Sequence, residues 1–215
     1  MCKYVVMDLE MCHVSAKVPQ YRNKLEIIQI GAVLLDENFE ITERFNTYVA
    51  PQYGELDSYI TNLTGITEKD LTDAPHCQEA LAAFLAWIPE GDTKIVSWSK
   101  SDKKQIYNEA GTKEIDLTDW QPYIDTWIDA QKGFSEKMNS SKSYGLTEAL
   151  FISNITPEGT MHDGLSDAYN TAVLFRKMMT EEEFTINEYY YSVTREETEH
   201  LSSSLGDLLK GFTFS

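Results

Sequence analysis

The sequence predicts a single α/β domain with a mixed central sheet flanked by helices. Strand-like segments at residues 3–9, 25–35 and 40–50 follow one another closely near the N-terminus. A further short strand at 93–98 then stands among segments with helical spacing of apolar residues. The chain has 215 residues, 42% of them hydrophobic, which is enough for one packed core.

The first three strands predict an antiparallel meander. Residues 3–9 are apolar on both faces, which is typical of a central strand covered by helices on each side. Residues 25–35 form a long β-branched run, and Asp36-Glu37-Asn38 supplies the turn to the alternating segment 40–50. We therefore expect these strands to lie side by side.

The remaining segments are predominantly helical. Gly111 stands where a residue following a helix C-terminus is expected. The region 115–130 contains Pro122 and predicts a helix broken by a turn, whereas 132–142 predicts a polar loop and 181–191 is helical or extended. The predicted helices are 56–63, 75–87, 101–110, 143–151, 165–179 and a last short one at 202–210. Without repeats or a linker, we expect a domain at 1–180 and an acidic extension at 181–215, packed on it or trailing from it.

Charge alone argues against a nucleic-acid partner, because the formal net charge is −17 and phosphate binding depends on lysine and arginine. The basic residues are nevertheless grouped, so a locally basic cleft on an acidic body is compatible with the sequence. Such a protein should bind polyanions weakly and with low processivity. The groups are Lys17, Arg22 and Lys24; Lys94, Lys100, Lys103 and Lys104; Lys132, Lys137 and Lys142; Arg176 and Lys177.

The sequence favours a cytoplasmic protein without a membrane partner. No apolar run approaches the roughly 20 residues that span a bilayer, and the N-terminus lacks the pattern of a secretory leader. The cysteines Cys2, Cys12 and Cys77 are odd in number and irregularly spaced. They predict neither a disulfide framework nor a zinc site.

Several carboxylates stand where an acid is costly. Asp8 and Glu10 lie two residues apart in a strand and so share one face, where repulsion and lost hydration oppose ionisation. Asp102 follows a strand, and Asp167 lies in the first turn of a helix. Each alone is typical of a solvated cap. Together they predict a site for two divalent cations, Mg²⁺ or Mn²⁺, at the roughly 3.5–4 Å separation used in phosphoryl displacement.

His162 fits the same site. It stands five residues before Asp167, and on an ideal helix the two side chains would diverge by about 140°. Gly164 and the capping candidates Asp163 and Ser166 instead predict that the helix starts after His162. The imidazole would then lie on a loop beside the cations, where a pKa of about 6.5 suits it to take a proton from water.

These residues resemble a known family. Asp8-x-Glu10, Trp98-Ser-x-x-Asp102 and His162-x-x-x-x-Asp167 resemble, in order and spacing, the three motifs of the DEDDh 3′–5′ exonucleases. That superfamily includes the proofreading subunit of DNA polymerase III, ribonuclease T and oligoribonuclease. Residues 26–36, 63–67 and 162–172 are similar to the branch that trims histone messenger and small interfering RNAs. The resemblance covers residues 3 to about 180 and departs at Ser99, where a glycine is common.

The resemblance implies an RNase H-like exonuclease domain with named roles for its residues. Asp8, Glu10 and Asp167 would ligate one cation, Asp8 would bridge to the second, Asp102 would hold it through water, and His162 would be the general base. The 3′-terminal nucleotide would contact Met11, Thr64, Gly65 and Ile66. For Met11 and Ile66, core packing is an equal alternative, and Gly65 also suits a turn of positive φ. The segment Lys132–Lys142 is either a phosphate-tracking flank or a solvated loop.

The resulting hypothesis is a metal-dependent 3′–5′ exonuclease that acts on single-stranded 3′ ends and releases nucleoside 5′-monophosphates. RNA is favoured over DNA because of the branch that the sequence resembles. One alternative is a regulatory protein on an exonuclease scaffold, such as an inhibitor of a signalling kinase. Another is an RNase H-like endonuclease, which would cut internally and act on a strand with a blocked 3′ end.

Overall fold

The computed structural model describes residues 2–14, 18 and 24–190. Its sheet has six strands in the order β3-β2-β1-β5-β6, with β4 paired to β1. The strands are β1 Lys3–Val14, β2 Leu25–Leu35, β3 Ile41–Tyr48, β4 Gly54–Glu55, β5 Thr93–Ser97 and β6 Ile128–Asp129. The helix predicted at 202–210 and the basic residues Lys17 and Arg22 lie outside the described residues.

The sheet is mixed, as the sequence predicted. β1, β2 and β3 form the antiparallel meander, whereas β5 is parallel to β1 and β6 is parallel to β5. The helices are α1 Ser58–Thr64, α2 Glu68–Leu71, α3 Cys77–Trp87, α4 Ser101–Lys113, α5 Gln121–Asp125, α6 Ala130–Lys137, α7 Leu146–Ile152 and α8 Gly164–Thr180, with a 3₁₀ turn, η2, at Thr118–Trp120.

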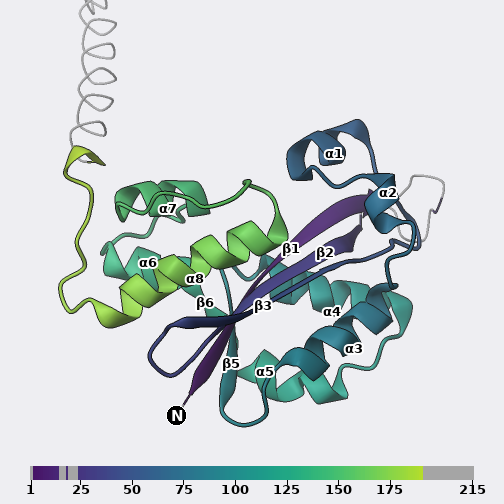
Figure 1. The fold of residues 1–215 in the computed structure, drawn as a ribbon, viewed down its shortest axis with the longest axis horizontal. Helices are drawn as coiled ribbons and strands as arrows, with labels where there is room; N and C mark the ends of the chain where they lie inside the picture. Colours follow the sequence, from purple (N-terminus) through teal and green to yellow (C-terminus); the bar gives the residue numbers. More distant parts are fainter. Residues whose placement is uncertain (1, 15–17, 19–23, 191–215) are drawn as a thin grey trace, which may run out of the picture.

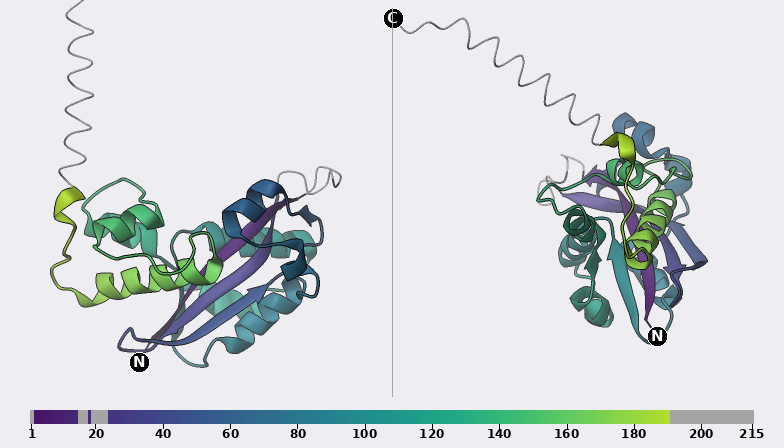
Figure 2. Two further views of the ribbon diagram at one scale, coloured as in Figure 1. Left: turned by 45° about the horizontal axis from the view of Figure 1, so that its top comes forward. Right: turned by 90° about the vertical axis from the view of Figure 1, so that its left-hand side faces the viewer.

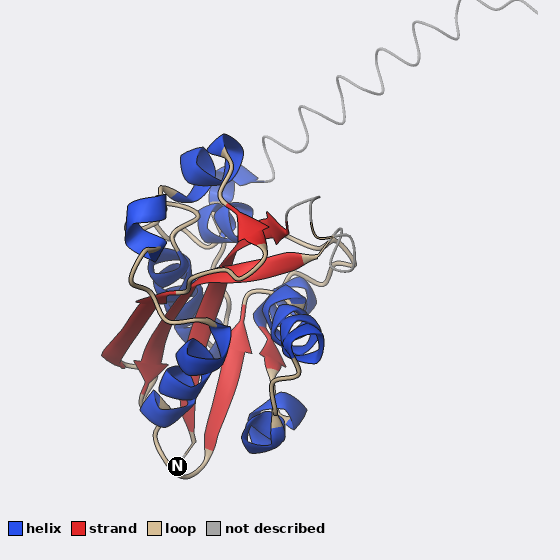
Figure 3. Cartoon of the chain, turned by 90° about the vertical axis from the view of Figure 1, so that its right-hand side faces the viewer, coloured by secondary structure: helices blue, strands red, loops and turns tan. Residues whose placement is uncertain are grey.

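Helices cover both faces of the sheet (Figures 1 and 3). Val5, Met7 and Leu9 of β1 are buried in one core with α3, η2 and α5. Val6 points to the opposite face and belongs to a second core with α6, α7 and α8. Because side chains alternate along a strand, Asp8 and Glu10 share the face of Val6, on the side of α8.

The start of α8 lies directly against β2. A Cβ atom added to Gly31 would stand 2.1 Å from the carbonyl carbon of Gly164, the first residue of α8. Glycine in a strand permits such close backbone approach. Since Gly31 is paired with Asp8, the helix start is brought onto the acidic part of β1.

Three predicted boundaries are wrong, and the two-residue strands β4 and β6 were not predicted. β1 extends to Val14 instead of residue 9, because β2 and β4 continue to pair with it. α4 runs through Gly111 to Lys113, and Glu114 adopts the left-handed conformation that ends the helix, with φ of 56°. The predicted polar loop 132–142 is helical up to Lys137. The cap of Asp129 and the burial of Ala130 and Phe134 hold that helix in place.

Residues 181–190 lie against the domain. The N–H of Asn187 donates to the carbonyl of Ile152 at 2.6 Å, and the ring of Phe184 meets Phe134 edge-on with centroids 5.9 Å apart. The start of β1 lies at the end of the molecule opposite α1 (Figure 2). Among the helices of the described ranges, none is long and apolar enough to cross a membrane.

Candidate active site

Asp8 and Glu10 lie at the centre of the sheet, beneath the start of α8. Asp8 is partly buried, and Glu10 is 8% exposed. Their partners on β2 are Gly31 and Gln29. Directly after Glu10 the pairing register shifts, which leaves Ile28 as an extra residue on β2. Such a bulge twists the strands locally and redirects the side chains beside it.

Asp102 enters the site from the other layer of helices. The pairing between β1 and β5 stops at Val6, so Leu9 has no strand partner on that side. Its N–H donates instead to Oδ1 of Asp102 at 3.2 Å. Asp102 stands in the first turn of α4 and is only 3% exposed. The strand-to-helix junction therefore places this carboxylate beside the strand acids.

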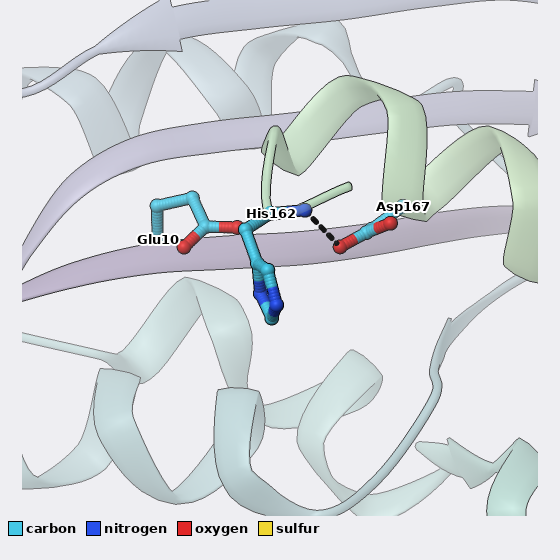
Figure 4. A group of neighbouring side chains, drawn as sticks. All are labelled: Glu10, His162 and Asp167. Atoms are coloured by element: carbon cyan, nitrogen blue, oxygen red, sulfur yellow. Dashed lines mark hydrogen bonds between the residues drawn. The ribbon is translucent and has the colours of Figure 1, made fainter. Parts of the chain in front are cut away.

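His162 and Asp167 close the site at the start of α8. The helix begins at Gly164, with Asp163 as the N-cap, so His162 lies before the helix as the sequence predicted. His162 has φ of 60°, which is uncommon for a residue with a side chain. Its N–H donates to Oδ2 of Asp167 at 3.0 Å, and the exposed histidine stands between Glu10 and Asp167 (Figure 4).

Glu10, His162 and Asp167 form a group that could hold a metal ion. One ligand atom from each lies within 4.8 Å of the other two. Asp8 and Asp102 are outside this group but approach it closely enough to interact electrostatically with its acids. The sequence had assigned His162 only as a base, whereas the structure also makes its imidazole a candidate ligand.

The carboxylates are strongly perturbed. Burial, followed by the charges of Asp102 and Glu10, raises the pKa of Asp8 well above its ordinary value. Burial and the charge of Asp167 raise the pKa of Glu10 to about 8. Burial also raises the pKa of Asp102 to about 6, although hydrogen bonds to its carboxylate oppose this.

The pKa of Asp167 is raised too, chiefly by burial. No lysine or arginine in the part of the chain that the structure describes is ion-paired with any of the four acids. Buried carboxylates without a cationic partner are costly. Their oxygen donors match the preference of Mg²⁺ and Mn²⁺, so the residues fit a divalent cation.

The predicted nucleotide contacts lie at the α1 end of β1. Thr64 and Ile66 are buried at 6% and 2% exposure, and Ile66 packs with Cys12, Ile28 and Ile60. The hydroxyl of Thr64 donates to the carbonyl of Ile60 and accepts the N–H of Ile66. Gly65 ends α1 with φ of 76°, so the turn role considered for it is confirmed.

Met11 and Gly65 are the more accessible members of this set, with Met11 partly buried and Gly65 exposed. No atom lies within 4 Å of a Cβ added to Gly65. Two other residues that shape the site, Gln29 and Gly31, were missed as functional residues. The available signal was a polar residue and a glycine inside the otherwise apolar run Ile27-Ile28-Gln29-Ile30-Gly31-Ala32-Val33.

Comparisons with known proteins agree with this geometry. A family model described as "Exonuclease", RNase_T, matches residues 5–175. ERI1 exoribonuclease 2 of Danio rerio is 30% identical over 179 residues, which cover 73% of this chain and 32% of the relative. DNA polymerase III subunit epsilon of Aquifex aeolicus is 30% identical over 189 residues, which cover 87% of this chain and 86% of the relative.

Solved structures share the fold. The nuclease domain of 3′hExo, described as a DEDDh family member bound to rAMP, superposes with a TM-score of 0.73 at 23% identity. The match covers 86% of this chain and 96% of that domain. The chain thus spans about a third of the zebrafish relative but nearly all of the isolated nuclease domain. Since the family model matches residues 5–175, which include the four acids and the histidine of the site, the chain belongs to the RNase_T exonuclease family.

Proposed function

We propose that this protein is a divalent-metal-dependent 3′–5′ exonuclease that removes nucleotides from single-stranded 3′ ends, with RNA preferred over DNA. The observation that carries the proposal is the convergence of four perturbed carboxylates and His162 at the start of α8, without a cationic side chain from the described residues to neutralise them. Residues 1–180 would form the catalytic domain, and 181–215 an extension of it.

The carboxylates have the role of holding cations. Asp8, Glu10 and Asp167 would bind one Mg²⁺ or Mn²⁺, and Asp8 and Asp102 a second, with Asp102 acting through water. Bound there, the cations would neutralise the buried acids and stabilise negative charge on the reacting phosphodiester. The proposal is supported by the placement of Asp102 against Leu9, which brings the fourth acid to the strand pair.

His162 would act as the general base. Its imidazole is exposed and lies on the loop before α8, within reach of Glu10 and Asp167. A water molecule would attack the phosphorus, its proton would pass to the imidazole, and the bond from phosphorus to the 3′ oxygen would break. The terminal nucleotide would leave as a 5′-monophosphate. The 3′ oxygen would take a proton from solvent water, so the shortened strand would end in a 3′-hydroxyl.

The terminal nucleotide would lie against Met11 and the segment Thr64–Ile66. Met11 and Gly65 offer accessible surface, whereas Thr64 and Ile66 would act mainly by fixing the shape of the loop. Apolar surface stacked on a base tolerates any sequence. The preference for RNA is supported by the exoribonuclease among the relatives and by the rAMP in the related nuclease domain.

The test is a single-stranded RNA with a 5′ fluorophore, incubated with the protein and Mg²⁺ or Mn²⁺. We expect a ladder of products shortened one nucleotide at a time, no cleavage in EDTA and slower cleavage of the matched DNA. Asp8→Asn should abolish the ladder, whereas Asp73→Asn, a change at an exposed acid in a loop, should leave it intact.

Two other outcomes would select the competing functions. Internal cuts that persist on a 3′-blocked strand would indicate an endonuclease. Absence of any nucleotide release with either metal, on both RNA and DNA, would contradict the exonuclease and favour a regulatory role for the scaffold.

A further inference from the structure

Gln29 is a fully buried polar residue at the centre of an apolar strand. Its exposure is 0%, and its neighbours Ile28 and Ile30 are equally buried. Burying an amide costs free energy unless its donors and acceptor are satisfied. Because Gln29 is the antiparallel partner of Glu10, its side chain stands on the same face of the sheet as the acids of the site.

The amide of Gln29 is fully engaged by α8 and β3. Its Nε2 donates to Oδ1 of Asp163 at 2.8 Å and to Oδ1 of Asn46 at 3.0 Å. Its Oε1 accepts the N–H of Gly164 at 3.0 Å. The opposite orientation of the amide would face two acceptors with an oxygen, so the network permits only one.

We infer that Gln29 is a positioning residue that fixes His162 and Asp167 for catalysis, an inference that rests on the proposed function. Two of its partners, the N-cap Asp163 and the first residue of α8, Gly164, directly follow His162 in the chain. His162 is in turn held to Asp167 by its N–H. One side chain from β2 thus anchors the backbone from which the imidazole projects.

Gln29 also keeps a fifth acid out of the metal group. Oδ1 of Asp163 is occupied by Gln29, and Oδ2 accepts both the N–H and the hydroxyl of Ser166. Both oxygens of Asp163 therefore accept hydrogen bonds at the start of α8. They do so although Asp163 directly follows His162 of the metal group. The charge of Asp163 already contributes to the raised pKa values of Asp8, Glu10 and Asp167. Without the Gln29 donor, Oδ1 of Asp163 would also be left to compete for cations.

Position 29 requires an amide. A leucine of similar size would leave the N–H of Gly164 and one oxygen of Asp163 without partners beneath the helix. A buried N–H or carboxylate oxygen that loses its partner is destabilised, so the helix start should shift to recover hydrogen bonds. A displacement of about 1 Å at a catalytic group reduces turnover by as much as 10²-fold.

The experiment compares Gln29→Leu with Gln105→Leu. Gln105 is also a buried amide, at 6% exposure, and its Nε2 donates to Leu25 and Glu109, away from α8. Both variants should lose some thermal stability. We expect kcat of Gln29→Leu to fall roughly 10- to 100-fold with KM changed less than threefold, and Gln105→Leu to keep kcat within about threefold.

A second measurement tests the hydrogen bonds between Gln29 and the start of α8 without relying on turnover. Amide hydrogen exchange followed by NMR should show loss of protection at Gly164 in Gln29→Leu, while amides of β1 and β5 remain protected. Equal kcat values for Gln29→Leu and the wild type, or an unchanged exchange rate at Gly164, would overturn the inference. If the wild type hydrolyses no substrate, the proposed function fails, and the exchange measurement still decides whether Gln29 holds the helix start.

Discussion

The backbone N–H of His162 donates a hydrogen bond to Oδ2 of Asp167 at 3.0 Å. The left-handed conformation of His162, with φ of 60°, turns that N–H toward the helix start. The position of the Asp167 carboxylate therefore depends on the backbone at residue 162. The imidazole is left available for a separate task.

This separation predicts the behaviour of His162→Ala. The variant keeps the N–H, so we expect Asp167 to stay in place and the affinity for Mn²⁺ to change less than about threefold. Loss of the general base should lower kcat about 10²- to 10⁴-fold. Isothermal titration with Mn²⁺ and single-turnover kinetics measure the two effects, and His13→Ala, at an exposed position on β1, is the control. A large fall in Mn²⁺ affinity would instead identify the imidazole as a metal ligand.

Gly31 offers a test of how tightly α8 must lie on the sheet. In Gly31→Ala the new methyl group would come within 2.1 to 2.4 Å of backbone atoms of Gly164 and Leu165. Backbone cannot yield as a flexible side chain does, so α8 should move and kcat should drop at least tenfold, with a loss of stability of about 1–3 kcal/mol. Retention of full activity would show that the contact is adjustable.

Gly111→Ala is the control for Gly31→Ala, because an added methyl group at Gly111 has free space around it. Gly111 lies inside α4 and no atom is within 4 Å of an added Cβ. Alanine should stabilise the helix by roughly 0.5–1 kcal/mol without affecting turnover. Urea denaturation should show a lower free energy of unfolding for Gly31→Ala and a higher one for Gly111→Ala.

The three meander strands and the start of α8 were predictable from the sequence because both depend on short-range patterns. The β-branched run at 25–35 coincides with β2. His162, Gly164 and Asp167 were placed correctly around a helix start because capping residues have a local signature. The acids of β1 were informative because a carboxylate in an apolar strand needs a physical reason.

Features that depend on distant partners were not predictable. α6 has few apolar residues, and its helical state depends on Phe134 packing against Trp98 and Tyr144. α4 continues past Gly111 because Lys113 reaches Glu26 at 2.5 Å and Glu109 at 2.8 Å. The role of Gln29 required knowing that residue 164 lies above it. The contacts of Phe134 with Trp98, of Lys113 with Glu26 and of Gln29 with Gly164 join residues far apart in the sequence, so no local pattern predicts them.

The ion network around Lys113 predicts a large effect on stability. The side chains of Lys113, Glu26 and Glu109 are 8% or less exposed. Lys113→Met would leave two buried carboxylates without their cation, so the free energy of unfolding should fall by about 3–5 kcal/mol. In contrast, Lys132→Met breaks a pair with Glu136 whose side chains are 68% and 69% exposed, and should cost no more than about 0.5 kcal/mol. Equal effects in urea denaturation would contradict the buried network.

The raised carboxyl pKa values predict an unusual dependence of stability on pH in EDTA. The pKa of Glu10 is about 8 in the folded protein, against an ordinary value of about 4.3. Between these values the folded state binds more protons than the unfolded state, so the free energy of unfolding decreases as pH rises. Asp102, whose pKa is about 6, also lowers the free energy of unfolding as pH rises. Stability from these groups is fully present below about pH 4 and is lost as pH rises through about 8.

Divalent cations should reverse that loss. Cations and protons compete for the same oxygens, so Mg²⁺ should raise Tm more at pH 8 than at pH 6. Glu10→Gln should flatten the pH profile in EDTA and reduce the Mg²⁺ effect. A profile in EDTA that rises with pH from 5 to 8 would be incompatible with buried, protonated acids in this site.

The outward face of α4 predicts how salt affects substrate binding. Lys100 and Lys104 flank Asp102 in sequence, are exposed, and have no ion pair with other described residues. They stand four residues apart at the start of the helix and therefore on one face of it, turned to solvent and away from the buried Asp102. On a chain with a net charge of −17, this face can attract a single strand toward the acids.

We expect each lysine to contribute about 0.7 to the slope of log affinity against log salt. The double change Lys100→Ala and Lys104→Ala should therefore reduce the slope of log(kcat/KM) by about 1.4 while kcat stays constant. Arg176→Ala is the control, because Arg176 is paired with Glu40 at 3.0 Å. A slope unchanged in the double variant would show that the strand approaches the site by another face.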